Sequence, residues 1–546
     1  MTVAARACWI AFMVLAASLP YVVNYAATPE GFHYTWIMPP YHQDSLAYMA
    51  WSEQATRGSI LFKLKYTALP HAPFLFHPLF LVSGWLKALL SWDPGIIHWI
   101  MKGLGIVLFW LVYFRYTDYL KLNPFQQVAA TVLVGTSSGF GWLYYGFLGY
   151  GVGGNPLHLP PDLWMPETNT FWSLLWNPLF AYSLTVLLLS AYLLDRGTEE
   201  ADGRSMWLGG LAAGFLTLIH PYHVPLIFTL AAGLAFFRLR GRASAMLARY
   251  YGVALPFVAV VFLISKLHPL ASQHSISGEM ASPPLWSEAL GFGLPLVLFL
   301  AGVAAGRGDF VKKYLLPVTW IVLALIFSQL PFWFQRKFIF GAHVPLGILA
   351  GVAFGIFVAK VAGPWRKPAI AAALLLAAPL TLSTQVFHLA LQREIVGSNY
   401  EGAYYISDDL RAAMKYLRAD SGADDLVFAA ESTSTLVPAY SGNTVLWGHW
   451  AMSVDWQERR AWKERAFGTG PTEEAARELA KTGVRYVLVD DAFRGSFGDP
   501  RPGFFSQYGK VFEKGEVAIY RQEKSRPRLA LEGSVEDAEK DGSTRS

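Results

Sequence analysis

The sequence predicts a polytopic α-helical membrane protein with about eleven transmembrane helices, followed by a small α/β domain. Hydrophobic residues make up 54% of the chain and charged residues only 15%, whereas soluble domains carry about 25% charged residues. The charges are sparse from Met1 to about Ala390 and dense from Glu401 onward. Lipid and water therefore surround two different parts of one chain, which we take as a membrane domain over 1–390 and a soluble domain over 391–523.

The first apolar run covers residues 8–27, and a helix needs about 20 such residues to cross the hydrocarbon core. It contains no small-residue cleavage site, so we expect a retained span and not a signal peptide. Cys8 is the single cysteine, which excludes an intrachain disulfide. The next segment, 28–94, is mixed in character and is the expected first external loop. Its apolar stretch 74–92 contains Lys87, His77 and Pro78 and follows directly on Pro73, which predicts a helix lying in the membrane interface.

Further apolar runs continue the pattern of spans up to the start of the soluble domain. The predicted spans are 95–114, 126–147, 171–194, 206–219, 222–237, 248–266, 288–306, 314–332, 338–359 and 368–388.

Lysine and arginine indicate how these spans are oriented, because short cytoplasmic loops are enriched in them. If the N-terminus is cytoplasmic, every short loop on that side is basic, through Arg115 and Lys121; Arg196 and Arg204; Arg238, Arg240 and Arg242; Arg307, Lys312 and Lys313; Arg366 and Lys367. Loops 148–170 and 268–287, on the other side, contain neither residue type. Counting 74–92 as a span would reverse this arrangement. We therefore expect a multi-pass plasma-membrane protein whose C-terminal domain is extracytoplasmic.

The last third of the chain has the alternation of a small α/β domain. Helical spacing of apolar residues predicts helices at 408–418 and 472–481. Short apolar runs predict strands at 426–429, 444–447 and 484–489, and a hairpin at 511–520. Residues 524–546 are polar and nearly free of aromatic side chains, which predicts a disordered tail.

The sharpest candidate for chemistry is the run HQDSLAY at 42–48, just after the first span. Its carboxylate, Asp44, would face the polar head of a membrane-bound substrate, with His42 and Tyr48 as further substrate contacts. Asp44 could equally cap a helix, because aspartate is favoured at the N-cap and an apolar periodic run follows. The two roles can coexist.

A second acidic cluster is the run PDLWMPETN at 161–169, before a predicted span. If Asp162 and Glu167 converge with Asp44, they supply a base for a hydroxyl nucleophile or oxygen ligands for a divalent cation. Asp162 also fits a solvated loop tip beside an interfacial tryptophan. Glu167 lies closer to the membrane and is the stronger candidate of the two.

A pair of histidines separates two apolar halves in the run IHPYH at 219–223. Ionisable groups at such a position are costly and are often functional, which makes His220 and His223 candidate substrate contacts. A proline-centred turn between two helices also needs polar groups merely to satisfy its backbone. The sequence is compatible with both a substrate contact and a structural turn.

The basic pair Arg336 and Lys337 stands on the outer side, against the charge rule. Aromatic residues flank it on both sides, in the run FWFQRKF at 332–338. Such a pair is suited to hold a lipid-linked phosphate through charge-assisted hydrogen bonds. The alternative is snorkelling toward anionic headgroups.

Several signatures are missing from the sequence. It contains no Walker-type phosphate loop, no His-Glu-x-x-His zinc pattern and no Gly-x-Ser-x-Gly elbow. The net charge of +5 is explained by the basic loops, so we expect no nucleic-acid partner.

The overall layout resembles the GT-C class of integral membrane glycosyltransferases, which contains protein O-mannosyltransferases and lipid A aminoarabinose transferases. The likeness covers a first span, an external segment with an early aspartate, an interfacial helix opening at PFLFHP (73–78), and many spans. The runs YSGNTVLWGH (440–449) and GVRYVLV (483–489) in the terminal domain also resemble members of that class.

The resemblance implies transfer of a sugar from a polyprenyl-phosphate carrier to a hydroxyl group on a lipid, glycan or protein acceptor at the outer face. The early acid of the class corresponds to Asp44. Many members have paired acids there, whereas Gln43 and Ser45 flank a single aspartate here. Whether a metal is required therefore stays open, with a divalent cation as the candidate cofactor.

The mechanism that this implies is a single inverting displacement. Asp44 would act as the base, Arg336 and Lys337 would stabilise the departing phosphate, and Glu167 would orient the acceptor or bind a cation. One alternative is a transporter or flippase of lipid-linked glycans. Another is a membrane scaffold that binds through an exposed 440–449 run.

Overall fold

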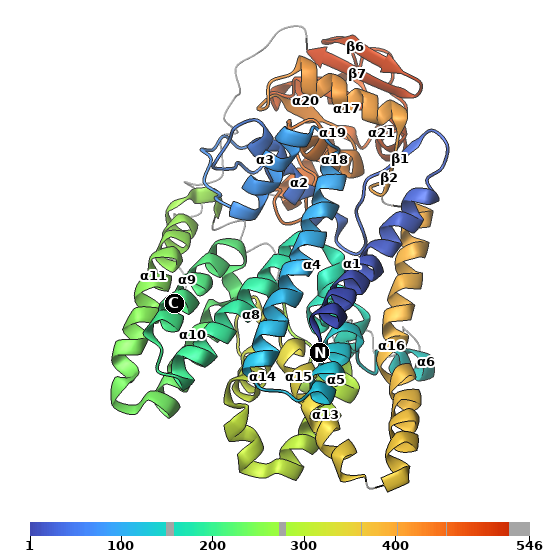
Figure 1. Ribbon diagram of the computed structural model, residues 1–546. Helices are drawn as coiled ribbons and strands as arrows, with labels where there is room; N and C mark the ends of the chain where they lie inside the picture. Colours follow the sequence, from blue (N-terminus) through green and yellow to red (C-terminus); the bar gives the residue numbers. More distant parts are fainter. Residues whose placement is uncertain (149–157, 272–279, 362, 401, 455, 523–546) are drawn as a thin grey trace, which may run out of the picture.

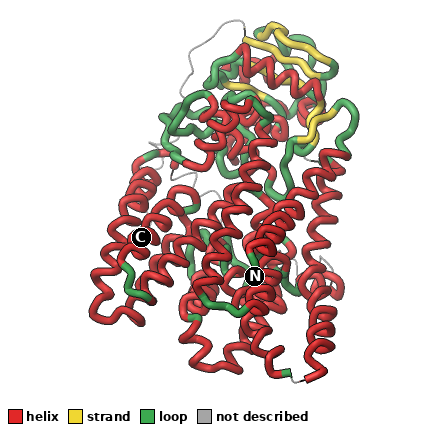
Figure 2. Tube along the Cα trace, in the orientation of Figure 1, coloured by secondary structure: helices red, strands yellow, loops and turns green. Residues whose placement is uncertain are grey.

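The computed structural model describes residues 1–148, 158–271, 280–361, 363–400, 402–454 and 456–522. Figure 1 shows a tall helical bundle with a smaller domain at one end, and Figure 2 places nearly all strands in that smaller domain. This is the architecture of a polytopic membrane protein that carries a small α/β domain. The predicted disordered tail at 524–546 lies outside the described residues.

Helices at every predicted span position form the bundle. They are α1 (Val3–Ala26), α4 (Pro94–Tyr119), α5 (Pro124–Thr136), α6 (Gly141–Leu148), α7 (Thr170–Trp176), α8 (Pro178–Glu199), α9 (Gly203–Ile219), α10 (Val224–Leu239), α11 (Ala243–Leu267), α13 (Leu285–Lys313), α14 (Leu315–Ser328), α15 (His343–Lys360) and α16 (Arg366–Ser398). Within the described ranges, seven helical stretches are long and apolar enough to cross a membrane, and one of them, Pro221–Leu267, covers both α10 and α11.

Two predicted spans, 126–147 and 171–194, are broken in the structure. In the first, the chain leaves the helix after α5, and the N–H of Ser138 donates to the carbonyl of Thr381 in α16 (2.8 Å). In the second, α7 ends before Asn177, whose side chain caps α8. Backbone groups at membrane depth must be satisfied inside the protein. The breaks are tolerated because a neighbouring helix and a capping side chain provide the partners.

The stretch predicted to be interfacial forms α3 (Pro78–Leu90), outside the bundle. It lies at the end where the C-terminal domain sits (Figure 1) and packs on α2 (His42–Thr56). A close approach at Gly84, whose added Cβ would lie 2.4 Å from the carbonyl oxygen of Ser52, brings the two backbones together. The first external segment is therefore a folded layer over the end of the bundle.

The turns predicted to be cytoplasmic lie at the opposite end of the bundle. Figure 1 shows this for the α10–α11 turn, the end of α13 and the start of α16. The turn between α10 and α11 contains η5 (Arg240–Arg242), and the last turn of α13 carries Lys312 and Lys313. The segregation of basic residues seen in the sequence is thus a spatial segregation to one end of the molecule.

The C-terminal domain is built on a five-stranded sheet in the order β4-β3-β5-β7-β6. β3 pairs in parallel with β4 and β5, whereas β5–β7 and β6–β7 are antiparallel. The predicted strands, helices and hairpin are all present. The elements are α17 (Asp408–Asp420), β3 (Leu426–Phe428), α18 (Glu431–Tyr440), β4 (Thr444–Val445), α19 (Trp456–Phe467), α20 (Glu473–Lys481), β5 (Tyr486–Val489), α21 (Asp491–Phe497), β6 (Tyr508–Lys514) and β7 (Val517–Gln522).

A second, two-stranded sheet joins the first external segment to the start of the C-terminal domain. β1 (Phe32–Tyr34) pairs antiparallel with β2 (Tyr405–Ser407), and the N–H of Thr35 extends the ladder to Tyr404 (2.9 Å). The expected boundary at 390 falls inside α16, which continues to Ser398. The extension remains ordered because Arg393 donates from Nη1 to the side chain of Asn24 in α1 (3.0 Å).

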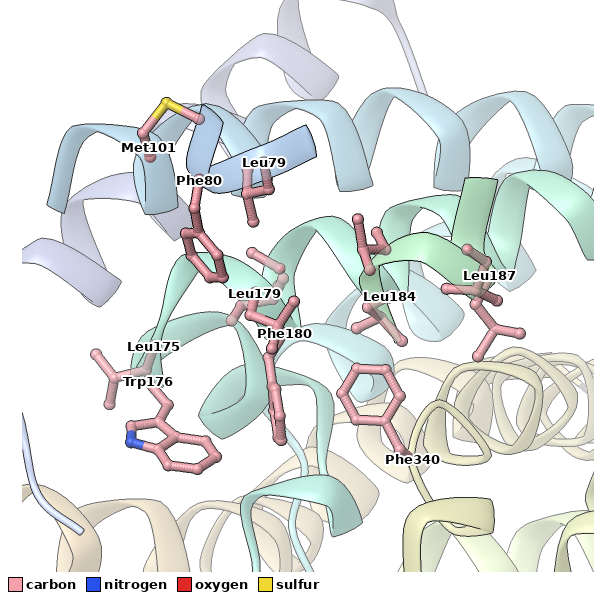
Figure 3. Close-up of a cluster of buried hydrophobic side chains, with 14 of the residues drawn as sticks. Leu79, Phe80, Met101, Leu175, Trp176, Leu179, Phe180, Leu184, Leu187 and Phe340 are labelled. Atoms are coloured by element: carbon pink, nitrogen blue, oxygen red, sulfur yellow. The ribbon is translucent and has the colours of Figure 1, made fainter. Parts of the chain in front are cut away.

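The core of the bundle continues into the external segment. Figure 3 shows Phe80 of α3, Met101 of α4, Trp176 of α7 and Phe180 of α8 in one cluster of buried side chains, together with Phe340. The indole N–H of Trp176 donates to the carbonyl of Pro40 (2.9 Å). This continuity holds the external layer in one position relative to the bundle.

α15 packs against α5 through a row of glycines, Gly347, Gly351 and Gly355. These residues are four apart and therefore lie on one face of the helix. A Cβ added to Gly351 would lie 2.3 Å from the backbone nitrogen of Ala130. A methyl group does not fit at that distance, so α15 and α5 depend on the absence of a side chain here.

We therefore expect Gly351→Ala to lower the free energy of unfolding by about 1–3 kcal/mol, since α15 must move away from α5. Thermal unfolding of the detergent-solubilised protein measures this loss. Gly233→Ala in α10 is the matched control, because an added Cβ there meets nothing within 4 Å. Equal stability of the two variants would contradict the close contact.

Candidate active site between the bundle and the C-terminal domain

Asp44 lies in the first turn of α2, where its negative charge faces the positive end of the helix dipole. It is not the helix N-cap, as one of the two readings of the sequence had it. Tyr41 holds the N-cap position with φ 61°, and its side chain makes no capping hydrogen bond. The Asp44 carboxylate is 27% exposed, so a substrate can reach it.

Glu167 and Lys337 form a buried ion pair. The Nζ of Lys337 donates to Oε1 of Glu167 at 2.6 Å, and the Nε of Arg336 lies 3.9 Å from the same oxygen. η3 (Pro166–Thr168) holds the acid and η6 (Gln335–Phe338) holds both cations. Burial alone raises the pKa of the Glu167 carboxyl, but the charges of Lys337 and Arg336 outweigh it and hold that pKa below its ordinary value.

Arg336 keeps unused hydrogen-bonding capacity. Among the described residues, its buried Nε has no hydrogen-bond partner. Its guanidinium carbon lies 5.9 Å from the centre of the Trp164 ring. With two cations and one carboxylate, the cluster of Glu167, Arg336 and Lys337 has an excess of one positive charge.

Two tyrosines of the first external segment, Tyr41 and Tyr48, are close to both this cluster and Asp44. Burial raises the pKa of the Tyr41 hydroxyl; the charge of Arg336, which hydrogen-bonds it, opposes the rise. The negative charges of Glu167 and Asp44 both act on the same hydroxyl. Burial likewise raises the pKa of Tyr48, with contributions from the same two carboxylates. The acid of α2 and the cluster around Glu167 therefore face a common region.

The C-terminal domain contributes His449 to this region. Its Nδ1 accepts hydrogen bonds from the backbone N–H groups of Ala451 (3.0 Å) and Met452 (3.3 Å). A nitrogen that accepts carries no proton, so the proton of the neutral ring is on Nε2. That nitrogen faces Oδ1 of Asp44 at 3.4 Å. Next to it, the side chain of Gln43 accepts from the N–H of Trp450 (3.1 Å).

Residues 441–449 are buried, which corrects the expectation of an exposed binding surface in the 440–449 run. His449 is 1% exposed, and its ring lies 5.5 Å from that of Tyr66 in the first external segment. The run is covered because it forms the contact with that segment. The hypothesis of a membrane scaffold rested on an exposed surface here, and the burial of the run removes that support.

His220 and His223 form a buried pair beside Phe340. Their Nδ1 atoms are 2.9 Å apart, and both rings pack on Phe340. The ring of Phe180 lies between His220 (5.9 Å) and the Nζ of Lys337 (5.4 Å). Phe180 therefore contacts both the histidine pair and the charged cluster.

Asp162 is placed against α16 and not beside Glu167. Its carboxylate accepts from the hydroxyl of Thr384 (2.9 Å) and from the N–H of Gly141 (3.2 Å). Burial raises its pKa to about 7. The reading of Asp162 as a solvated loop tip is wrong, because its side chain is fully buried. His42 also packs inward, on the ring of Tyr404, while Tyr48 stacks on Phe80.

Sequence reasoning did not single out Tyr41, Gln43, Tyr222 or His449. Tyr222 packs on Trp333 and Phe334, the aromatic residues that precede the cationic pair. For His449 a signal was available, since it closes the 440–449 run. Across the described part of the chain, no group of three or more His, Cys, Asp or Glu side chains is placed to hold a metal ion.

The chain is similar to known proteins in its structure and not in its sequence. No family model and no curated protein sequence matches the chain. The structure of the mycobacterial arabinofuranosyltransferase AftD matches with a TM-score of 0.50 and 14% identity, over 93% of this chain and 41% of AftD. The chain has a GT-C fold.

Other solved structures with the GT-C fold match at similar levels. The archaeal oligosaccharyltransferase AglB from Archaeoglobus fulgidus, solved with an inhibitory peptide and a dolichol-phosphate, is 14% identical over 96% of this chain and 75% of its own, with a TM-score of 0.47. ArnT from Cupriavidus metallidurans, bound to undecaprenyl phosphate, is 14% identical over 94% and 97%, with a TM-score of 0.48. At this identity the similarity concerns the fold.

The ion pair of Glu167 and Lys337 yields a test of the cluster. Lys337→Met leaves a buried carboxylate with less compensation, so we expect a loss of about 3–5 kcal/mol in the free energy of unfolding at pH 7. The pKa of the Glu167 carboxyl rises in that variant, so the carboxyl takes up a proton as the pH falls. The loss of unfolding free energy relative to the unaltered protein therefore becomes smaller at lower pH. Thermal unfolding at several pH values measures both effects.

The control is the double variant Lys337→Met/Glu167→Gln, which removes both charges. It should recover part of the lost stability and show a weaker dependence on pH than Lys337→Met alone. A double variant as unstable as the single one would mean that the two side chains are not coupled.

Proposed function

We propose that the protein is a membrane glycosyltransferase that moves a sugar from a polyprenyl-phosphate donor to a hydroxyl acceptor. The GT-C fold supports this class of reaction. The observation that carries the proposal is the pairing of an accessible carboxylate, Asp44, with a cluster of positive excess charge around Arg336 and Lys337. Transfer from a phosphate-linked donor needs both, a base for the acceptor and a counter-charge for the leaving group.

In the proposed reaction the acceptor oxygen attacks the anomeric carbon of the sugar, and the bond from that carbon to the phosphate oxygen breaks. Asp44 takes the proton of the acceptor hydroxyl. The electron pair of the broken bond leaves with the polyprenyl phosphate, whose added negative charge Arg336 and Lys337 stabilise. A single displacement of this kind inverts the configuration of the anomeric carbon.

Arg336 is the better placed of the two cations to contact the donor phosphate. Lys337 is already bonded to Glu167, whereas the Nε of Arg336 has no hydrogen-bond partner within the described ranges. We assign Glu167 the role of holding Lys337 and Arg336 in place. Tyr48 and Tyr222 line the region beside Asp44 and are proposed substrate contacts. We assign a structural role to the buried residues His42, His220, His223 and Asp162.

We further propose that the reaction takes place on the extracytoplasmic face of the plasma membrane. The basic turns lie at the end of the bundle remote from α2, the helix that carries Asp44, and by the positive-inside rule that end is cytoplasmic. Polyprenyl-phosphate sugars presented at the opposite face would meet the site from the lipid. A divalent cation stays a candidate cofactor, for which Asp44 is the accessible oxygen ligand.

Asp44→Asn should lower the rate of sugar transfer by about 10²–10⁴-fold, because the amide cannot take up the proton of the acceptor. Purified protein incubated with a panel of polyprenyl-phosphate sugars, with release of the free carrier phosphate as the readout, measures this rate. Glu30→Gln, which removes an exposed carboxylate in the same external segment, is the control and should keep full activity.

Near-normal turnover of the Asp44→Asn variant would remove this residue from the mechanism. Movement of a labelled lipid-linked glycan across a vesicle membrane, without any release of carrier phosphate, would favour the alternative function of a transporter or flippase.

His449 offers a separate test of how Asp44 is positioned. His449→Asn can still accept from the N–H groups of Ala451 and Met452, but it loses the N–H group that faces Asp44. We expect kcat to fall roughly tenfold or more with KM unchanged, because the base is no longer oriented. His449→Gln, whose amide reaches the position of Nε2, should restore part of kcat.

Thermal unfolding of both His449 variants is the control for a purely structural role. If the stability of His449→Asn falls together with its kcat, and His449→Gln behaves no better, then the imidazole only holds the C-terminal domain in place.

A further inference from the structure

α3 presents an apolar face that no part of the described chain covers. Val82, Trp85 and Leu89 follow one another at intervals of three and four residues, so they share one side of the helix, and all are exposed. Trp92, just beyond the end of α3, is exposed as well. The opposite side is buried, with Phe80 and Gly84 packed on α2. An exposed apolar face rich in tryptophan, at the end of a membrane bundle, is expected to lie among lipid headgroups.

Beside this face a single buried carboxylate collects three cations. Glu53 of α2 is fully buried, and its Oε1 is 3.0 Å from the Nε of Arg57 and 3.1 Å from an Nη of Arg418. The Nζ of Lys87, in α3, donates to the other oxygen. One negative charge therefore faces three positive ones, and two positive charges are left over.

A neighbouring acid does not cancel this excess. Asp93 is close enough to act on the charge of Lys87, but its carboxylate already faces His33 at 3.1 Å and Arg411 at 3.7 Å. Arg411 and Arg418 are seven residues apart in α17 and lie on the same side of that helix. In the part of the seam around Glu53 and Asp93, the four cations Arg57, Lys87, Arg411 and Arg418 therefore outnumber the two acids.

The excess charge borders a hollow in the surface. Its volume is about 410 Å³, and it is lined by Thr56, Lys87, Ala88, Ser91, Trp92 and Arg418. Trp92 and Ser91 immediately precede Asp93, which caps α4, the helix that crosses the membrane. The hollow therefore lies at the level where that span leaves the lipid. It is separate from the site around Asp44, whose residues do not line it.

We propose that this hollow binds the phosphate headgroup of an anionic membrane phospholipid. Arg418, which is 39% exposed, contacts the phosphate. Lys87 and Arg57, held by Glu53, supply the surrounding positive potential. The acyl chains of the lipid lie along Val82, Trp85 and Leu89. Binding of this kind ties the C-terminal domain, through α17, to the membrane surface, and it does not depend on the proposed transfer reaction.

The test is retention of lipid by the purified, delipidated full-length protein, measured by native mass spectrometry after addition of phosphatidylglycerol or phosphatidylcholine. We expect phosphatidylglycerol to be retained in preference. Arg418→Gln should weaken its retention by about fivefold, the effect expected of one basic residue near an anionic lipid surface. Arg418→Lys, which keeps the charge, should retain most of it.

Arg460→Gln is the matched control, because it removes an exposed arginine of the same domain that pairs with Glu464 within α19. It should leave retention unchanged. Equal retention of the two lipids, or equal losses in Arg418→Gln and Arg460→Gln, would overturn the proposal. So would displacement of phosphatidylglycerol by millimolar inorganic phosphate, since the hollow would then be a site for a small anion and not for a lipid.

Discussion

The requirement that backbone polar groups be satisfied inside the protein at membrane depth governs this structure. Where the helices of the bundle stop short, the freed groups find partners on neighbouring elements, as the N–H of Ser138 does on the carbonyl of Thr381. η3, η4 (Pro221–His223) and η6 are short turns of this kind, between α6 and α8, α9 and α10, and α14 and α15. They carry Glu167, His223 and the cationic pair, and His220 is the N-cap of η4. The same breaks that interrupt the helices thus place the candidate functional side chains.

Charge inside such a protein needs compensation, and the two charged clusters at this end of the bundle handle it differently. Around Glu167, one carboxylate is shared by two cations, which leaves a single positive charge beside Asp44. Around Glu53, one carboxylate is shared by three cations. Buried cations in excess are costly unless an anion joins them. We propose a phosphate group as the missing partner of each cluster, carried by the donor in the first case and by a membrane lipid in the second.

The C-terminal domain contributes to the candidate active site. The pairing of β2 with β1, and the hydrogen bond from the N–H of Trp450 to Gln43, attach the domain to the first external segment at two points. His449 then faces Asp44 from the domain side. Because the core is continuous from the bundle through α3 into this layer, α2 and its carboxylate are held in one position relative to both the bundle and the domain (Figure 3).

The sequence by itself determined the division between lipid and water, the positions of the apolar helices, the strands of the terminal domain and the charge asymmetry of the loops. These follow from local composition, since apolar length and basic residues act wherever they stand. Asp44, Glu167, Arg336 and Lys337 stood out for the same reason, as charges in loops beside spans. Only the tertiary structure decided their partners. Glu167 and Lys337 are 170 residues apart in the chain, and neither that pairing nor the approach of His449 to Asp44 leaves any periodicity to read. The breaks in 126–147 and 171–194 were hidden because an interrupted apolar run has the same composition as a continuous one, and the hydrogen bonds that permit an interruption come from elsewhere in the fold.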